Sequence, residues 1–263
     1  MRKGYYTALF LFSLSTSWLA CKRQKINEQE SEPPTETVTK KQLIPIKFVS
    51  DKLSLTFEYQ AGTTLMTKIS HSDNSHTLIS YQPKYYRVEQ VKNNTVYHYA
   101  DFILTDGKAT KVHTFDSFGR VDIPTGHYTL GYNLKGELAE IVDYNVSNEL
   151  ILKKEISYDA AGNIVELKVA DKQNKTTLFE YKSDNKNGIF KNVNHARLLF
   201  LEIADDFLCP DVNNWLSSKN ALIPQQDIKF SYLYNADDYP TQMIMEGPQG
   251  KQTFTITYAE VSN

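Results

Sequence analysis

Apolar and polar residues alternate over several short stretches of this chain. In residues 52–59 (KLSLTFEY) the leucine, phenylalanine and tyrosine side chains share one face, and the lysine, serine, threonine and glutamate side chains share the other. The same period of two returns at residues 229–234 and 253–258. This alternation indicates strands with one packed face and one face in contact with water.

Turn signals separate these stretches at short spacing. They fall at residues 72–75, 92–94, 105–107, 145–148, 171–174 and 247–250. Because such connections are too short to hold crossover helices, most strands must be hairpin partners. The pattern predicts a mainly β domain, an antiparallel meander of repeated hairpins that forms a curved sheet or an open barrel.

One local pattern repeats: an aromatic residue, Asp or Asn, two further residues, Gly, one residue, and an apolar residue. It occurs at residues 115–119, 132–136 and 158–162, and a fourth copy at 234–240 has Asp238 in place of Gly. A strand that ends on the aromatic residue, an Asx turn and a glycine with positive φ explain the spacing. Asp tolerates the left-handed conformation better than most residues, so the fourth copy fits as well.

Residues 192–207 (NVNHARLLFLEIADDF) interrupt the β pattern with good helix formers, and Asn194 is a candidate N-cap. The helical face would comprise Val193, Ala196, Leu199 and Ile203. A buried strand over LLFLEI is the alternative. We predict one short helix near 192–207 that covers one face of the sheet or plugs a barrel end.

The N-terminus reads as an export signal. Residues 1–4 are basic, residues 5–14 are mostly apolar, and residues 15–20 (STSWLA) end directly before Cys21. This order resembles a bacterial lipobox, although Trp18 is atypical of that motif. It predicts a lipoprotein signal peptide over 1–20 and lipidation of Cys21. An ordinary secretory signal is the alternative, whereas a membrane helix would need about 20 apolar residues.

The next segment predicts a tether. Residues 21–42 are charged and polar, and such a composition does not bury enough surface to order itself. We therefore expect a lipidated cysteine and disordered tether over 21–42 and a single β domain over 43–263. Acyl chains on Cys21 would make the membrane a partner of the chain.

Only two cysteines are present, Cys21 and Cys209, which excludes a disulfide scaffold. If Cys21 is lipidated, Cys209 is a structural thiol, and a Cys21 to Cys209 disulfide in a chain cut upstream is the alternative. The neighbours of Cys209 supply carboxylates and not the cations that activate a thiol, which disfavours catalysis.

The charge pattern does not suggest a nucleic-acid partner. The chain has 29 basic and 31 acidic residues, a formal net charge of −2, and no basic stripe with interleaved aromatic residues.

Candidate chemistry is sparse. The nearest approach to a metal site is His71, Ser72 and Asp73 with His76, but these residues lie in a polar turn. The carboxylate pairs Asp205–Asp206 and Asp237–Asp238 fit a helix end and a turn without catalysis. The sequence has no HExxH, GxSxG or phosphate-binding motif. We predict no metal, no cofactor and a protein that is not an enzyme.

Tyrosines give the one suggestion of ligand binding. Tyr85, Tyr86, Tyr97 and Tyr99 lie close together in the sequence, and tyrosine rings commonly stack on sugars or peptides. Cross-strand aromatic pairs that stabilise the sheet are the alternative.

The hairpin repeats resemble the tyrosine-aspartate repeats of bacterial surface proteins and, more closely, uncharacterised Bacteroidetes lipoproteins built from such hairpins. The resemblance spans residues 115–258 and includes the segment 181–190, the asparagines at 213–214 and the hairpin that begins at residue 230. It implies a porin-like or stacked-hairpin sheet with no established activity.

Together these features predict a noncatalytic lipoprotein of the cell envelope, in the outer membrane, whose β domain binds a glycan, a peptide or an envelope protein. The alternative function is an exported hydrolase whose Asp, Glu and His residues come from distant parts of the chain.

Overall fold

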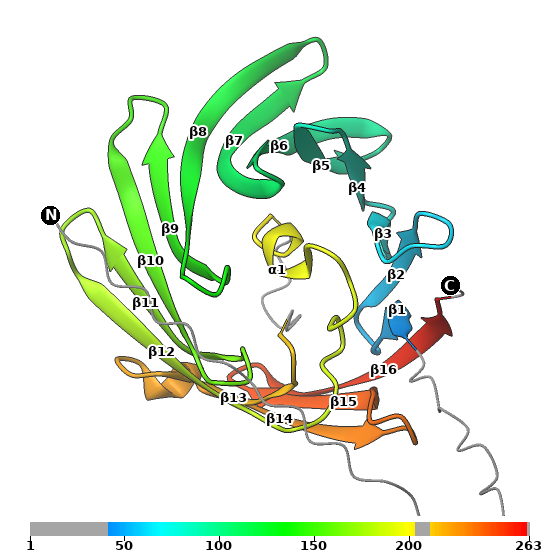
Figure 1. Ribbon diagram of the computed structural model, residues 1–263. Helices are drawn as coiled ribbons and strands as arrows, with labels where there is room; N and C mark the ends of the chain where they lie inside the picture. The colour runs from blue at the N-terminus through cyan, green and yellow to red at the C-terminus, as the bar shows by residue number, and fades with distance from the viewer. Residues whose placement is uncertain (1–41, 203–210, 262–263) are drawn as a thin grey trace, which may run out of the picture. The chain divides into compact units, whose positions relative to one another are not determined.

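The computed structural model describes residues 42–202 and 211–261, and in this part of the chain sixteen antiparallel strands form a closed barrel (Figure 1). The strands are β1 (Leu43–Val49), β2 (Ser54–Tyr59), β3 (Met66–His71), β4 (His76–Tyr81), β5 (Tyr85–Lys92), β6 (Thr95–Thr105), β7 (Lys108–Phe118), β8 (Val121–Tyr132), β9 (Leu138–Asn145), β10 (Leu150–Tyr158), β11 (Ile164–Asp171), β12 (Thr176–Ser183), β13 (Trp215–Asn220), β14 (Ile228–Tyr234), β15 (Pro240–Gly247) and β16 (Gly250–Glu260). A short helix α1 (Ala196–Leu199) and a 3₁₀ turn η1 (Pro224–Gln226) complete the described elements.

The first and last strands close the barrel. β1 pairs with β16 from Leu43 opposite Glu260 to Val49 opposite Thr255. The predicted antiparallel meander is confirmed, but the expectation of a curved sheet or open barrel is wrong. Closure pairs strands about two hundred residues apart, which local periodicity does not report, and it removes the free edges that an open sheet would expose.

The repeated turn has one geometry. In residues 132–136, the Asn133 Oδ1 atom accepts hydrogen bonds from the backbone N–H of Lys135 and Glu137, both at 3.0 Å, and Gly136 has φ of 82°. Asp159 with Gly162, and Asn235 with Asp238, repeat it. The predicted Asx turn is therefore confirmed for these three copies. The same loop joins β9 to β10 and β11 to β12, with Asn148 and Asn174 at positive φ.

The tyrosines that precede several of these turns have a structural role. Each hydroxyl donates a hydrogen bond to a carbonyl near the start of the preceding strand. The pairs are Tyr59 and Pro45 (2.7 Å), Tyr81 and Met66 (2.9 Å), Tyr132 and Ala109 (2.6 Å), and Tyr158 and Leu138 (2.6 Å). These bonds tie neighbouring strands together at one end of the barrel, and Tyr132 and Tyr158 make them from the aromatic position of the repeat.

The copy at residues 115–119 was misassigned. Here β7 continues to Phe118, and Asp116 lies within the ladder opposite Ile123. The two-residue turn falls at Gly119 and Arg120, with Gly119 at φ of 72°. Asp116 therefore starts no turn, because the strand pairing extends beyond it.

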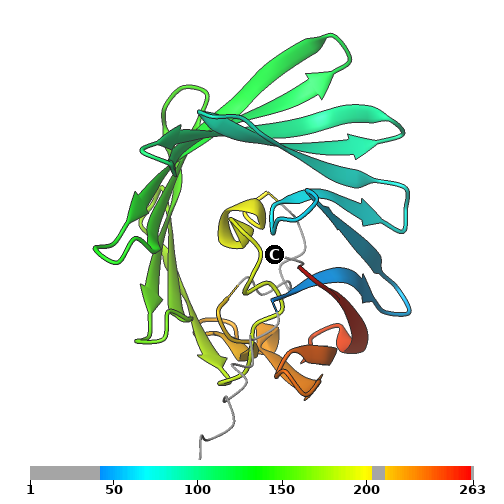
Figure 2. The same ribbon diagram turned by 45° about the vertical axis from the view of Figure 1, so that its right-hand side comes forward.

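Residues 184–202, in the connection between β12 and β13, enter the barrel and place α1 inside it (Figures 1 and 2). We call the described residues of this connection, 184–202 and 211–214, the plug. Its buried side chains pack with the barrel core, and they include Ile189, Phe190, Val193, Ala196, Leu198 and Leu199. The interior is therefore occupied in part by the chain itself.

The helix prediction is confirmed in kind but not in length. α1 has four residues, and residues 200–202 of LLFLEI form no strand. The expected N-cap is wrong, because His195 precedes the helix with φ of 62° and makes no side-chain cap bond. Asn194 instead donates its backbone N–H to Thr64 O at 3.1 Å. Val193, Ala196 and Leu199 are buried as expected, whereas Ile203 lies outside the described residues.

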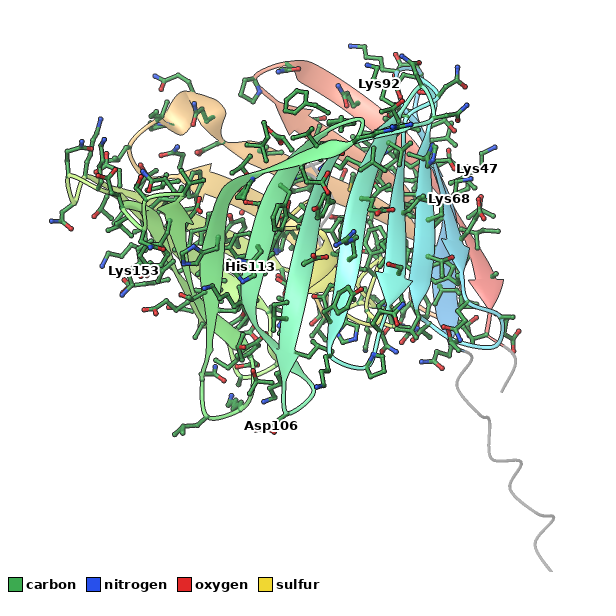
Figure 3. The ribbon with its side chains drawn as sticks, turned by 90° about the horizontal axis from the view of Figure 1, so that it is seen from above. Lys47, Lys68, Lys92, Asp106, His113 and Lys153 are labelled. Carbon is green, nitrogen blue, oxygen red and sulfur yellow. The ribbon has the colours of Figure 1, made fainter. Side chains whose placement is uncertain are left out.

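The outer wall of the barrel is charged. Lys47, Lys68, Lys153 and His113 project outward from the strands, as Figure 3 shows. Strand register adds partners on the same face: Lys68 lies 3.4 Å from Glu58, and Lys153 lies 2.8 Å from Glu140. The inner faces carry the buried apolar side chains, including Phe48, Leu55, Ile69, Phe102, Val112 and Phe254. Alternation along the strands thus separates an apolar interior from a charged exterior.

Candidate binding cavity inside the barrel

The barrel has two different ends. The turns at residues 60–65, 106–107, 133–137 and 159–163 lie at the end where the plug enters, which we call the plug end. The turns at 50–53, 93–94, 119–120 and 146–149 lie at the other end, which we call the cavity end. Asp106 and Lys92 mark the plug end and the cavity end in Figure 3.

A buried polar network holds the plug at the plug end. The carboxylate of Asp211 accepts hydrogen bonds from the Arg197 guanidinium, from Trp215 Nε1 at 2.9 Å and from the backbone N–H of Ile164 at 2.9 Å. The plug also approaches its own backbone closely at Gly188, where a Cβ atom would lie 2.2 Å from Asp211 O. These hydrogen bonds and the close backbone approach hold the plug in one position at this end of the barrel.

A cavity of about 320 Å³ lies between the inner wall and Leu201 and Glu202 of the plug. Strands β6 to β10 and the plug line it with His98, Thr114, Thr125, Gly126, Tyr128, Ile141, Asp143, Ile151, Leu152, Lys154, Leu201 and Glu202. The lining mixes polar and aliphatic side chains, and a concave site in which polar groups converge is the usual form of a small-molecule site.

Glu202 joins the plug to the wall beside this cavity. Its side chain is 10% exposed, its Oε2 atom lies 3.3 Å from His98 Nε2, and Tyr128 donates its hydroxyl proton to Oε1. The Glu202 carbonyl accepts a hydrogen bond from Gln90 Nε2 at 2.6 Å. His98 Nδ1 lies 2.9 Å from Asp116 Oδ1. One carboxylate on each side therefore favours the imidazolium form of His98.

The pKa values follow this arrangement. The hydrogen bond to Glu202, with help from Asp116, raises the pKa of His98 above its ordinary value, although partial burial opposes the shift. Burial, together with the charge of Glu202, raises the pKa of Tyr128 well above its usual range. Tyr128 is therefore a neutral hydrogen-bond donor to the side chain of Glu202.

Asp143 and Lys154 are the other charged groups of the cavity. They lie on the inner faces of adjacent strands, where Asp143 is opposite Leu152 in the register and Lys154 is opposite Ile141. Neither forms an ion pair with any other residue in the described ranges. Burial raises the pKa of Asp143, Lys154 lowers it, and Glu202 raises it further.

The four predicted binding tyrosines do not come together. Tyr86 lies in the core, 1% exposed, with its ring stacked on Phe102 at 4.5 Å. Its neighbour Tyr85 lies on the opposite face of the same strand, opposite Ile103. Tyr97 is 45% exposed and donates its hydroxyl proton to Gln90 Oε1 at 2.8 Å.

Tyr99 lies on the outer wall, beside a groove of about 380 Å³ that also contacts Arg87 and Asp122. It is only 7% exposed, because the Arg87 guanidinium lies 4.2 Å from its ring centroid and Phe115 stacks on it at 4.8 Å. The faces of its ring are thus occupied by cross-strand neighbours.

The remaining candidate groups serve turns. The Asp73 carboxylate accepts hydrogen bonds from the backbone and side chain of Ser75, and no group of three or more His, Cys, Asp or Glu residues in the described ranges is placed to hold a metal ion. Asp238 has φ of 63° and pairs with Lys186 at 2.7 Å. Cys21, Cys209 and Asp205–Asp206 lie outside the described residues.

The cavity residues were missed in the sequence because they belong to different strands. His98 and Glu202 are 104 positions apart. The available signal was the alternation of inward and outward side chains along each strand. Asp143 in LAEIVDYN and Lys154 in LILKKEISY occupy inward positions, where a side chain is normally apolar. A charged residue at such a position is a candidate for function.

No helix in the described part of the chain has the length and apolarity needed to cross a membrane.

No protein-family model matches the chain, and no curated protein matches it. Among solved structures, a porin-like protein from Bacteroides uniformis matches with a TM-score of 0.57 and 12% identity over 84% of this chain and 98% of that one. A porin-like protein from Bacteroides vulgatus matches with a TM-score of 0.50 and 11% identity, over 83% and 99% of the two chains. At these identities the likeness concerns the fold, and it confirms the expected porin-like β architecture.

Proposed function

We propose that this chain is a noncatalytic lipoprotein of the cell envelope, attached to a membrane through lipid on Cys21, whose barrel faces water and binds a small ligand in its interior cavity. The sequence supports the tether, the anchor and the envelope location. The arrangement of the side chains supports a water-facing barrel and a ligand site.

The observation that carries the proposal is the charged outer wall. A transmembrane barrel presents an apolar band about 25 Å tall to lipid, and Lys or Arg at the bilayer midplane costs about 2 to 4 kcal/mol. Lys47, Lys68 and Lys153 project from this wall, and Glu58 and Glu140 pair with two of them. Such a surface suits water better than acyl chains, which supports attachment to the membrane through the lipid on Cys21.

The interior supports ligand binding over conduction. The plug fills part of the barrel with apolar side chains, and the network around Asp211 holds it there. The remaining cavity at Asp143 and Lys154 has the volume of a small molecule. Binding of a larger glycan, peptide or envelope protein stays a prediction for the outer surface.

Acyl labelling of the full chain tests the anchor. We expect incorporation of a labelled fatty acid into the wild-type protein and its loss in Cys21→Ser, because the acceptor sulfur is removed. The matched control is Cys209→Ser, which should retain the label. Label that persists in Cys21→Ser would contradict the proposal, as would extraction of that variant from membranes only by detergent.

An exported hydrolase is the second candidate, because the cavity brings Asp143, Glu202 and His98 together from separate elements. Burial raises the pKa of Asp143, which suits a general acid, and Glu202 supplies a second carboxyl group in the same cavity. A panel of chromogenic glycosides and esters tests it. Hydrolysis by the wild-type protein that is lost in Asp143→Asn would favour this function over a binding protein.

A further inference from the structure

The cavity contains two opposite charges without ion-pair partners in the described ranges. Asp143 and Lys154 are both inward-facing, yet their charged atoms are more than the 4 Å of an ion pair apart. Both side chains are partly exposed, and Lys154 lowers the pKa of Asp143, so the two charges act on each other. A ligand in the cavity therefore meets a negative group and a positive group side by side.

The other polar groups of the cavity are already engaged. Glu202 accepts from Tyr128 and contacts His98, whose second nitrogen contacts Asp116. The hydroxyl of Thr125 donates to Thr114 Oγ1 at 2.8 Å. These groups fix the wall and the plug, which leaves Asp143 and Lys154 as the groups available to a ligand.

A ligand with a single charge would satisfy one of these residues and repel the other. A cation bound by Asp143 would be repelled by the nearby Lys154 ammonium group. An anion bound by Lys154 would be repelled by the nearby Asp143 carboxylate. A zwitterion satisfies both, with its ammonium group at Asp143 and its carboxylate at Lys154, through charge-assisted hydrogen bonds at each end.

The rest of the lining defines the body of the ligand. Ile141, Leu152 and Leu201 supply aliphatic surface next to the charged pair, and the lining contains no aromatic ring other than those of Tyr128 and His98. The volume of about 320 Å³ leaves room for a side chain of a few heavy atoms beside the two charged groups of the ligand. An aliphatic side chain is the complement of such a surface.

We propose that this cavity binds an aliphatic α-amino acid, with its ammonium group toward Asp143, its carboxylate toward Lys154 and its side chain against Ile141, Leu152 and Leu201. This inference rests on the ligand-binding role proposed above and names the class of the ligand.

Isothermal titration of the full chain with three ligands tests the charge requirement without any mutation. Leucine carries both charges, N-acetyl-leucine lacks the ammonium group, and leucinamide lacks the carboxylate. We expect leucine to bind at least about tenfold more tightly than either analogue, since each loses a charged hydrogen bond. Equal affinity for all three, or no heat of binding with leucine, would overturn the proposal.

Two variants then assign the ends of the ligand. Lys154→Met should weaken leucine binding at least about tenfold and leave leucinamide unchanged. Asp143→Asn should remove the preference for leucine over N-acetyl-leucine. The matched control is Lys153→Met, which removes the adjacent lysine on the outer wall and should leave leucine affinity intact. An equal loss in Lys153→Met and Lys154→Met would refute the assignment.

Failure here is distinguishable from failure of the general proposal. Acyl labelling at Cys21 reports the anchor and does not depend on the ligand. Thermal unfolding followed by circular dichroism shows whether each variant is folded, and the ligand series on the wild-type protein gives its answer even if a variant is not.

Discussion

The two ends of the barrel differ in how their polar groups are used. At the plug end, Asp211 is buried and three donors satisfy it, and tyrosine hydroxyls close the neighbouring strands. At the cavity end, Asp143 and Lys154 have no ion-pair partner in the described ranges, and Phe118 and Val121 at a hairpin tip are exposed. The comparison indicates that the polar groups of the plug end maintain the fold, whereas those of the cavity end are the ones to which we assign the proposed ligand.

The largest expected effect comes from breaking the network of the plug end. Asp211→Ala removes the acceptor of Arg197, Trp215 and Ile164 and leaves the guanidinium without its charged partner. We expect a loss of about 3 to 5 kcal/mol in the free energy of unfolding, the usual result of removing one member of a buried ion pair. Urea denaturation of the full chain, followed by tryptophan fluorescence, measures it.

The matched control is Asp51→Ala, in an exposed turn at the cavity end. A surface substitution of this kind is expected to change stability by no more than about 0.5 kcal/mol. If both substitutions cost the same, the two ends do not differ as described.

The Asx turns were predictable from the sequence at both ends of the barrel. Asn133, Asp159 and Asn235 start turns through local hydrogen bonds, so their spacing to a residue with positive φ is visible in the chain. The turn pattern gave a wrong prediction at Asp116, because the pairing of β7 with β8 continues beyond this residue. A turn motif is therefore decisive only where no partner strand extends beyond it.

Barrel closure and the cavity required information that local patterns lack. β1 and β16 come from opposite ends of the domain, and Glu202 reaches the wall from a segment with no strand period. The plug was foreseen only as a short helix, since four residues in a helix leave little periodicity to detect. Long-range pairing, and not residue preference, decided these features.

A smaller effect is expected from the tyrosine hydroxyls. Tyr158→Phe removes the hydrogen bond to Leu138 O at the plug end but keeps the ring beneath Arg197. We expect a loss of about 0.5 to 1.5 kcal/mol in the free energy of unfolding. Tyr97→Phe is the control at the cavity end: its hydroxyl is exposed, water replaces its bond to Gln90, and the change should be near zero. Equal losses would mean that the hydroxyls do not distinguish the ends.

The smallest effect is a pH dependence at the contact between plug and wall. Hydrogen bonds to Glu202 and Asp116 raise the pKa of His98 above that of the unfolded chain, so protonation stabilises the folded state. This contribution is fully present below the unfolded pKa of about 6.5 and is lost as the pH rises through the folded pKa. The free energy of unfolding at about pH 6 and about pH 9 should therefore differ less in His98→Gln than in the wild type.

His113 on the outer wall is expected to give the opposite dependence of stability on pH. Burial, with a contribution from Lys111, lowers its pKa, so its share of the stability is present above the unfolded pKa and is lost as the pH falls through the folded one. In His113→Gln the destabilisation at alkaline pH should therefore persist, because His98 still loses its proton there. A pH profile that changes equally in both variants would show that the Glu202 contact does not hold the plug, and the difference between the two ends would then rest on the Asp211 network alone.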